Sequence, residues 1–176
     1  MDLVEWVLER LLTSRVQLVI IGTGDPRYEN LFRYYEWTRK GQVSANILFN
    51  ETRAHRVYAA ADAMLMPSRF EPCGLNQMYS MMYGTLPIVR STGGLEDSVD
   101  QYSEATGSGD GFKFSDATCE ALYNTIGWAC STWYDRPADI QKLRRNGMSK
   151  DFSWNKSAEK YALVYKWAVA ARSARF

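Results

Sequence analysis

Residues 67–75 read Pro-Ser-Arg-Phe-Glu-Pro-Cys-Gly-Leu, and residues 87–95 read Pro-Ile-Val-Arg-Ser-Thr-Gly-Gly-Leu. Each stretch leaves an apolar strand, makes a short polar or glycine-rich turn and then begins a helix. Ligands of open parallel sheets bind at such turns, at the carboxyl ends of the strands. The two turns therefore predict a shared crevice, with the Glu71 carboxylate between two helix N-termini that can hold phosphate. This pattern indicates an enzyme that acts on a nucleotide-linked substrate.

Apolar runs alternate with helical segments along the chain. The expected strands are residues 16–21, 46–49, 62–66, 86–89 and 111–114, and the expected helices are residues 2–12, 27–39, 52–61, 75–83 and 95–101. From residue 117 onward the pattern is helical, with breaks near residues 135–137 and 151–153. Such alternation predicts an α/β fold, a three-layer α/β/α Rossmann-like domain with a parallel sheet. Because a doubly wound sheet normally opens with a strand and this chain opens with a helix, we expect the first strand to be missing.

The composition narrows the class of protein. Apolar residues make up 46% of the 176 residues and charged residues 23%, with no apolar stretch long enough to cross a membrane. A formal net charge of +1 argues against a protein that binds nucleic acid or an anionic membrane. Lys and Arg are concentrated after residue 135, but they alternate there with apolar helical positions, which favours a solvated helix face. Three cysteines are too few for a disulfide framework, and their number is odd.

The first turn carries the main candidate residues. Glu71 projects from it, and Gly74 lets a ligand approach the backbone without a Cβ in the way. The amides of Gly74, Leu75 and Asn76 open the next helix, where they have no intrahelical acceptor and can donate to a diphosphate. The alternative interpretation is a capped turn whose glutamate faces solvent.

The second turn, Thr92-Gly93-Gly94-Leu95, repeats this geometry on the neighbouring strand. A Gly-Gly pair before a helix is a weak signal alone, but two adjacent turns would line one crevice. Phe49 ends its expected strand on the same rim, where an aromatic ring can stack on a nucleobase, although a core position is the commoner role.

Other residues near the turns have more ordinary explanations. Arg69 leaves its strand directly into the turn and is a candidate to face an anionic ligand. Cys73 is expected to be a packed small residue. Tyr79 and Tyr83 follow at helical spacing and are expected to belong to the core.

Several motifs together resemble a known family. They are Ile20-Ile21-Gly22-Thr23-Gly24-Asp25-Pro26, Ala59-Ala60-Ala61-Asp62, Met66-Pro67-Ser68-Arg69-Phe70-Glu71-Pro72-Cys73-Gly74-Leu75, Tyr83-Gly84-Thr85-Leu86-Pro87, Thr92-Gly93-Gly94-Leu95 and Asp151-Phe152-Ser153-Trp154. In this order and spacing they resemble bacterial glycogen synthase and plant starch synthase over nearly the whole chain. The most specific part is Arg-Phe-Glu-Pro-Cys-Gly-Leu.

The resemblance implies the C-terminal, donor-binding half of a GT-B fold, from a retaining glycosyltransferase. This family moves glucose from ADP-glucose to the non-reducing end of an α-1,4-glucan, with no metal and no cofactor, since ADP-glucose is a substrate. Glu71 would be the catalytic residue that contacts the donor glucose, and Phe49 would stack on adenine. The resemblance assigns nucleotide-sugar binding to Gly74, Leu75, Asn76, Thr92, Gly93, Gly94 and Leu95. Gly24, Arg69, Cys73 and Tyr79 are further candidates for this site.

The chain also departs from the family pattern. Asn76 stands where some members carry a phosphate-contacting Thr, and Tyr79 stands where many related GT-B transferases carry a second glutamate. The family's catalytic Arg and Lys precede the region that matches Asp2. We therefore expect residues 1–150 to be a nucleotide-sugar-binding domain truncated at its N-terminus, and residues 151–176 to be a helix that crosses back to an N-terminal domain. That domain would bind the glucan acceptor, and the chain alone is expected to be inactive.

Two other functions stay open from the sequence. One is a GT-B transferase with a different donor, such as UDP-glucose or GDP-mannose, and the other is a non-catalytic nucleotide- or glucan-binding module. The last helix has apolar residues on two faces, which predicts that the isolated chain self-associates. Acidic residues near the start argue against a targeting peptide, so we expect the bacterial cytoplasm or, in a plant, the plastid stroma.

Overall fold

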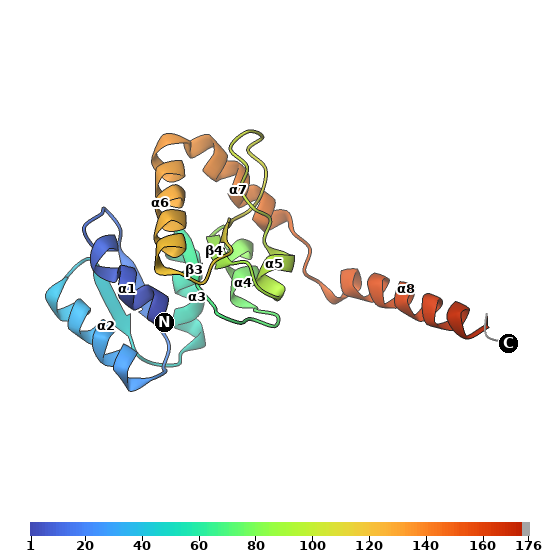
Figure 1. Ribbon diagram of the computed structural model, residues 1–176, viewed down its shortest axis with the longest axis horizontal. Coiled ribbons are helices and arrows are strands. Elements are labelled where there is room, and N and C mark those ends of the chain that lie inside the picture. The colour runs from blue at the N-terminus through green and yellow to red at the C-terminus, as the bar shows by residue number, and fades with distance from the viewer. Residues whose placement is uncertain (174–176) are drawn as a thin grey trace.

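The computed structural model describes residues 1–173, and within them five parallel strands form two sheets. The first sheet pairs β1 (Leu18–Ile21) with β2 (Val43–Asn46), and the second has the order β3 (Ala63–Met66), β4 (Leu86–Arg90), β5 (Phe112–Phe114). Figure 1 shows the helices around the strands. They are α1 (Asp2–Leu11), α2 (Pro26–Thr38), α3 (Glu51–Ala60), α4 (Asn76–Met82), α5 (Gly94–Ser98), α6 (Cys119–Asp135), α7 (Pro137–Ser149) and α8 (Trp154–Ser173).

Local sequence signals set the start of several helices. The side chains of Asp25, Asn50 and Thr118 each accept a hydrogen bond from a backbone amide in the first turn of α2, α3 and α6. Pro26 and Pro137 open α2 and α7, where the missing amide hydrogen costs nothing.

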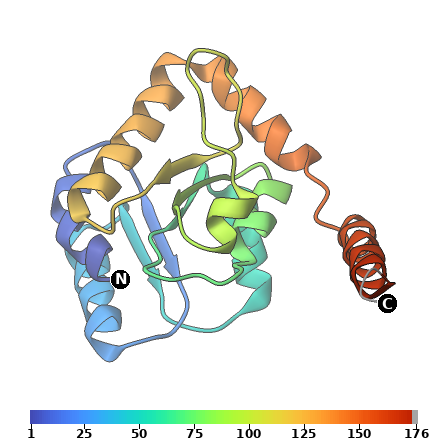
Figure 2. The same ribbon diagram turned by 45° about the vertical axis from the view of Figure 1, so that its right-hand side comes forward.

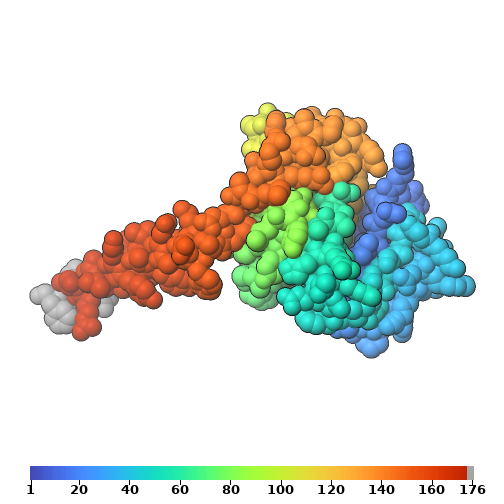
Figure 3. Space-filling model, turned by 180° about the vertical axis from the view of Figure 1, so that it is seen from behind, coloured from blue at the N-terminus to red at the C-terminus, as the bar shows by residue number. Residues whose placement is uncertain are grey.

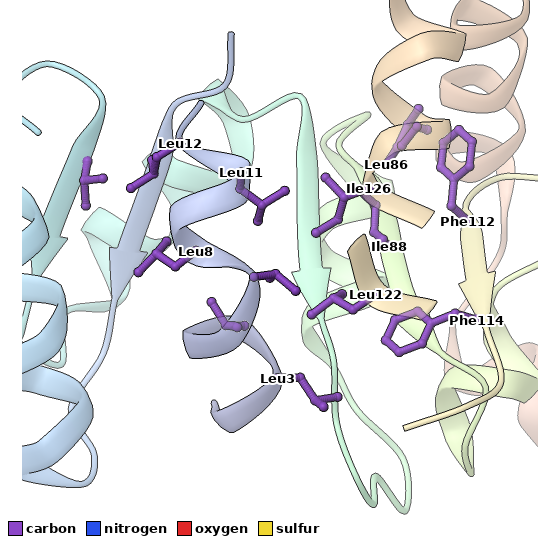
Figure 4. Packing of buried hydrophobic residues seen from close by; sticks show 14 of the residues in the cluster. Leu3, Leu8, Leu11, Leu12, Leu86, Ile88, Phe112, Phe114, Leu122 and Ile126 are labelled. Atoms are coloured by element: carbon purple, nitrogen blue, oxygen red, sulfur yellow. The ribbon is translucent and has the colours of Figure 1, made fainter. Parts of the chain in front are cut away.

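The core covers both faces of the second sheet, as the alternation of strand side chains requires. Leu86 and Ile88 of β4 belong to a buried cluster with residues of α1, α6 and β5 (Figure 4). Val89 of the same strand belongs to a second cluster that includes Met81 of α4 and Leu95 of α5. The α/β/α layering expected from the sequence is therefore confirmed.

The sheet is divided between β1 and β3. In the part of the chain that the structure describes, β1 is hydrogen-bonded only to β2, and β3 only to β4. The buried residues of α1 belong to the cluster that also contains Phe32 of α2, Val43 of β2 and Ile88 of β4. Apolar packing through α1 therefore connects the two sheets.

Two expected elements are wrong in position. The strand expected at residues 46–49 lies at Val43–Asn46, because Leu18–Ile21 pairs in register with these four residues. The apolar run that follows Asn46 is a loop, turned by a hydrogen bond from the Leu48 amide to the Asn46 carbonyl. The helix expected at residues 95–101 ends at Ser98, because Val99 is extended.

Helix α8 extends away from the other elements. Figures 1 and 2 show it beyond a short linker after α7, and Figure 3 shows it as an arm of the molecular surface. None of its described residues is buried. Residues 174–176 of the expected C-terminal segment lie outside the described residues. No helix in residues 1–173 has the length and apolar character that a membrane crossing needs.

Candidate functional site

The two turns predicted to share a crevice pack directly against each other. We call residues 67–75 the first turn and residues 92–95 the second turn. Because β3 and β4 are neighbouring parallel strands, with Met66 opposite Val89, both turns leave the same edge of the sheet. The Gly94 amide donates to the Glu71 carbonyl at 3.1 Å. The expectation that the two turns lie side by side is confirmed.

Both glycines of the second turn are required by this contact. A Cβ at Gly93 would lie 2.1 Å from the Glu71 carbonyl oxygen, and one at Gly94 would lie 2.0 Å from the Cys73 carbonyl oxygen. Gly93 also has a φ of +47°, in the left-handed region that favours glycine. The turns therefore meet backbone to backbone, with no side chain between them.

The amides of the first turn are available to a ligand. Within residues 1–173, the backbone N–H groups of Gly74, Leu75 and Asn76 have no hydrogen-bond acceptor, and Leu75 provides no side-chain cap for α4. Gly74 has a φ of +71°. A polar group placed against this turn would find three donors close together.

The second turn offers fewer donors than the sequence predicted. The Gly94 amide is bonded to the Glu71 carbonyl, and the Leu95 amide donates to the Thr92 carbonyl at 3.1 Å. The Gly93 amide has no acceptor among the described residues. In this structure the amides of Gly94 and Leu95 therefore shape the turn, and the side chain of Leu95 is fully buried in the second cluster.

Glu71 is half-buried, and its carboxylate forms few hydrogen bonds within the described part of the protein. Ser68 Oγ donates to its Oε2 at 3.4 Å, and no Lys, Arg or His within residues 1–173 forms an ion pair with it. A half-buried carboxylate without a cation can accept hydrogen bonds from a ligand.

Two arginines close to the turns are already engaged. Arg69 pairs with Asp2 at the start of α1, with Nε 3.1 Å from Oδ2, and this hydrogen bond holds the pKa of the Asp2 carboxyl below its usual value. Arg90 donates to the carbonyls of Arg69 at 2.7 Å, Ser68 at 3.3 Å and Ser115 at 3.2 Å. These guanidinium groups brace the first turn against α1 and the segment after β5.

The aromatic residues Phe49, Tyr79 and Tyr83 are exposed and do not lie in the core. Phe49 lies in the loop after β2 and is 90% exposed. Tyr79 of α4 and Tyr83, directly after α4, were expected in the core but are 40% and 44% exposed, because their rings lie next to His55 of α3 at the surface. The Tyr83 hydroxyl lies 3.0 Å from His55 Nδ1, and buried Tyr58 donates to Asn76 Oδ1 at 3.0 Å.

Two further candidates lie at the surface. Cys73 is exposed, so the expectation that it is packed is wrong. The Gly24 amide donates to Glu29 Oε1 at 3.0 Å at the start of α2. This bond satisfies the amide inside the protein.

Sequence reasoning missed Gln77. This side chain is fully buried, and its Nε2 lies 3.1 Å from the Cys73 carbonyl, 2.9 Å from the Gly74 carbonyl and 3.0 Å from Ser98 Oγ. Helical spacing from Ser80 and Met81, which are also buried, is the signal that would have placed it on the inner face.

Comparisons with known proteins show which family this chain is similar to. Residues 2–131 match the family described as glycosyl transferases group 1. The chain is 47% identical to the glycogen synthase of Lachnospira eligens over 94% of its length, and 47% identical to that of Clostridium novyi over 93%. It superposes on the catalytic domain of starch synthase IV from Arabidopsis thaliana, bound to ADP and acarbose, with a TM-score of 0.83 and 31% identity. That match covers 96% of this chain and 36% of the plant one. The chain spans about a third of the length of these bacterial relatives, 34% in both cases.

Proposed function

Because this chain belongs to the glycosyl transferases group 1 family, we propose that it is the donor-binding half of a glycogen or starch synthase. The complete enzyme would transfer glucose from ADP-glucose to the non-reducing end of an α-1,4-glucan, with retention of configuration. The observation that carries the proposal is the backbone-to-backbone packing of the two turns, beside amides that have no acceptor and a carboxylate that has no cation.

Each part of the site has a role in this proposal. The amides of Gly74, Leu75 and Asn76, together with that of Gly93, donate to the diphosphate. The Glu71 carboxylate accepts hydrogen bonds from hydroxyls of the donor glucose. The exposed ring of Phe49 stacks on the adenine, a contact that removes apolar surface from water. The bound ADP of the similar plant enzyme supports the choice of nucleotide.

The remaining chemistry belongs to other parts of the proposed enzyme. Residues 1–150 would form the nucleotide-sugar-binding domain, and residues 151–176 would cross back to a second domain that holds the glucan. The exposed apolar residues of α8 support this arrangement. Neither Arg69 nor Arg90 is free to stabilise the departing ADP, since both guanidinium groups are bonded within the protein. Without that stabilisation the barrier rises by several kcal/mol, so the purified chain should not extend glucan.

An amide NMR titration of the 176-residue chain with ADP tests the donor site, with UDP and GDP as parallel titrants. We expect shifts at Phe49, Gly74, Leu75, Asn76 and Gly93 with ADP, and none at these amides with UDP or GDP. Replacing Phe49 by Ala should weaken ADP binding, whereas replacing Trp37, another exposed aromatic residue, on α2, should not.

The other outcomes separate the alternatives. An equal response to UDP or GDP would contradict the ADP assignment and favour a transferase with another donor. A folded sample that responds to none of the nucleotides would contradict the donor site itself. Glucan extension by the purified chain, measured with ADP-glucose, would overturn the expectation that it is inactive alone.

A further inference from the structure

A buried hydrogen-bond network joins the two turns from beneath. Gln77 Nε2 lies within hydrogen-bond distance of the carbonyls of Cys73 and Gly74 in the first turn and of Ser98 Oγ at the end of α5, so its two N–H groups are shared among these three acceptors. Ser98 Oγ in turn donates to the Gly94 carbonyl at 2.5 Å. One amide group therefore links carbonyls of both turns through a single hydroxyl.

The network has little room to rearrange. Gln77 is fully buried and Ser98 is 9% exposed. A Cβ at Gly74 would lie 2.6 Å from Gln77 Oε1, so the side chain fills the space directly under the first turn. The Cys73 and Gly74 carbonyls share peptide units with the Gly74 and Leu75 amides, which have no acceptor among the described residues and are two of the proposed diphosphate donors.

The network also carries an energetic cost. Gln77 Oε1 is buried and has no hydrogen-bond partner among residues 1–173, and an unmade hydrogen bond of this kind opposes folding. A methionine of similar length would fill the same space and remove this unpaired oxygen, but it would take away the donor to the Cys73 and Gly74 carbonyls. A residue kept only for packing would not need this amide, so its use lies in what the Nε2 donor holds.

We propose that Gln77 is a positioning residue that holds the two turns at one separation, so that their amides bind the same diphosphate. This inference rests on the proposed donor site. Backbone donors lose strength steeply when they move from good hydrogen-bond geometry, so a small opening between the turns weakens a ligand that bridges them. Adenosine, which has no phosphate, should not sense the opening.

The test compares Gln77→Met and Ser98→Ala with Ser80→Ala in the 176-residue chain. Ser80 is the matched control, because it is fully buried on the same helix but donates only to the Gln77 carbonyl within α4. We expect Gln77→Met and Ser98→Ala each to weaken ADP binding about tenfold, as for the loss of one hydrogen bond. Adenosine affinity should stay within about twofold, and Ser80→Ala should bind ADP like the unchanged protein.

A double variant and a stability measurement distinguish a positioning role of Gln77 from a role in folding. If both residues act through one network, adding Ser98→Ala to Gln77→Met should weaken ADP binding little further. Urea denaturation should give Gln77→Met a free energy of unfolding close to that of the unchanged chain, since removing the unpaired oxygen offsets the loss of the donor to the Cys73 and Gly74 carbonyls. A variant that binds ADP as the unchanged chain does, or losses that are fully additive, would overturn the proposal.

Hydrogen exchange in the ligand-free chain tests the network independently of any donor. We expect the Gly94 amide, bonded to the Glu71 carbonyl, to exchange faster in Gln77→Met than in Ser80→Ala. Equal exchange in the two variants would contradict the inference even if ADP binds. If the unchanged chain fails to bind ADP while its Gly94 amide is protected through Gln77, the proposed function fails and the link between the turns stands.

Discussion

At the scale of single residues, the contact between the turns depends on the absence of a Cβ at Gly93 and Gly94. Gly94 leaves its amide free to reach the Glu71 carbonyl at 3.1 Å, and the space that a Cβ would need is taken by the Cys73 carbonyl. A side chain there must separate the two turns or displace the backbone of one of them. The same position therefore matters for folding and for the shape of the site.

Replacing Gly94 by Ala should lower the free energy of unfolding by about 2 kcal/mol or more, because the new Cβ would lie 2.0 Å from a backbone oxygen that cannot move alone. Gly127 provides the control. It lies inside α6, where a Cβ added to it would have nothing within 4 Å, so Gly127→Ala should stabilise the helix by about 1 kcal/mol. Urea denaturation of both variants measures these changes, and equal effects would contradict the packing argument.

Substituting Glu71 should change the affinity for ADP-glucose without changing the fold. Glu71→Gln keeps the shape of the side chain and removes its charge, so ADP-glucose should bind about tenfold more weakly while ADP binds as before. The reason is that the carboxylate is proposed to accept from the sugar and not from the nucleotide. Calorimetric titration with the two ligands measures the split, and a matching loss for ADP would contradict this role.

Residue types and spacing predicted the two turns because strand ends, glycines and an acidic residue leave a local pattern. The Gln77 network left no such pattern, since its bonds join α4 to α5 across 21 positions. The ion pair between Arg69 and Asp2 could not be predicted from the sequence either, because the two residues are 67 positions apart. Contacts between distant segments depend on the packed fold, which local sequence does not specify.

At the scale of secondary-structure elements, most helices were predicted more accurately than the strand at residues 46–49, the helix at residues 95–101 being the exception. Helix starts carry their own signals, as at Asp25 and Asn50. The bounds of β2 are instead set by pairing, because Val43–Asn46 is the segment that lies in register with β1. The more apolar residues after Asn46 misled the prediction, and Phe49 points into solvent.

The hydrogen bond between Tyr102 and Asp139 of α7 predicts how the free energy of unfolding depends on pH. Buried Tyr102 donates to Asp139 of α7 at 2.8 Å. Burial, followed by this hydrogen bond, raises the pKa of Tyr102 from 10.0 to about 12. Since the folded protein holds this proton more tightly than the unfolded chain, the contribution is complete below pH 10 and is lost as the pH rises from 10 to about 12.

Urea denaturation between pH 8 and pH 12 should therefore show a falling free energy of unfolding above pH 10, and Tyr102→Phe should make the fall shallower. Part of the fall should remain in this variant, because burial and then a hydrogen bond to Glu9 also raise the pKa of Tyr35 to about 12. Tyr134→Phe is the control, since this tyrosine is 60% exposed. Parallel curves for Tyr102→Phe and the unchanged chain would contradict the assignment.

At the scale of the whole molecule, packing is uneven. The strands and the helices α1, α2 and α4 to α7 contribute to two buried clusters, and α3 buries Tyr58, whereas α8 contributes no buried residue and extends as an arm (Figure 3). Large apolar side chains are nevertheless spread along α8, with Trp154, Tyr161, Leu163, Val164, Tyr165, Trp167 and Val169 all at least 48% exposed. A surface of this kind is typical of a helix that meets another surface.

The purified 176-residue chain should therefore self-associate through α8 at tens of micromolar, because pairing would remove these side chains from water at about 25 cal/mol per Å² of apolar surface. Light scattering across a dilution series measures the mass. Trp167→Lys should shift the chain toward the monomer, whereas Trp37→Lys should not, although the two tryptophans are 67% and 71% exposed. The difference follows from their surroundings, since Trp167 has Leu163 and Val164 on the preceding turn of an unpacked helix and α2 is packed against β2. A monodisperse monomer at these concentrations would contradict the prediction, and equal effects of the two substitutions would place the contact elsewhere on the molecule.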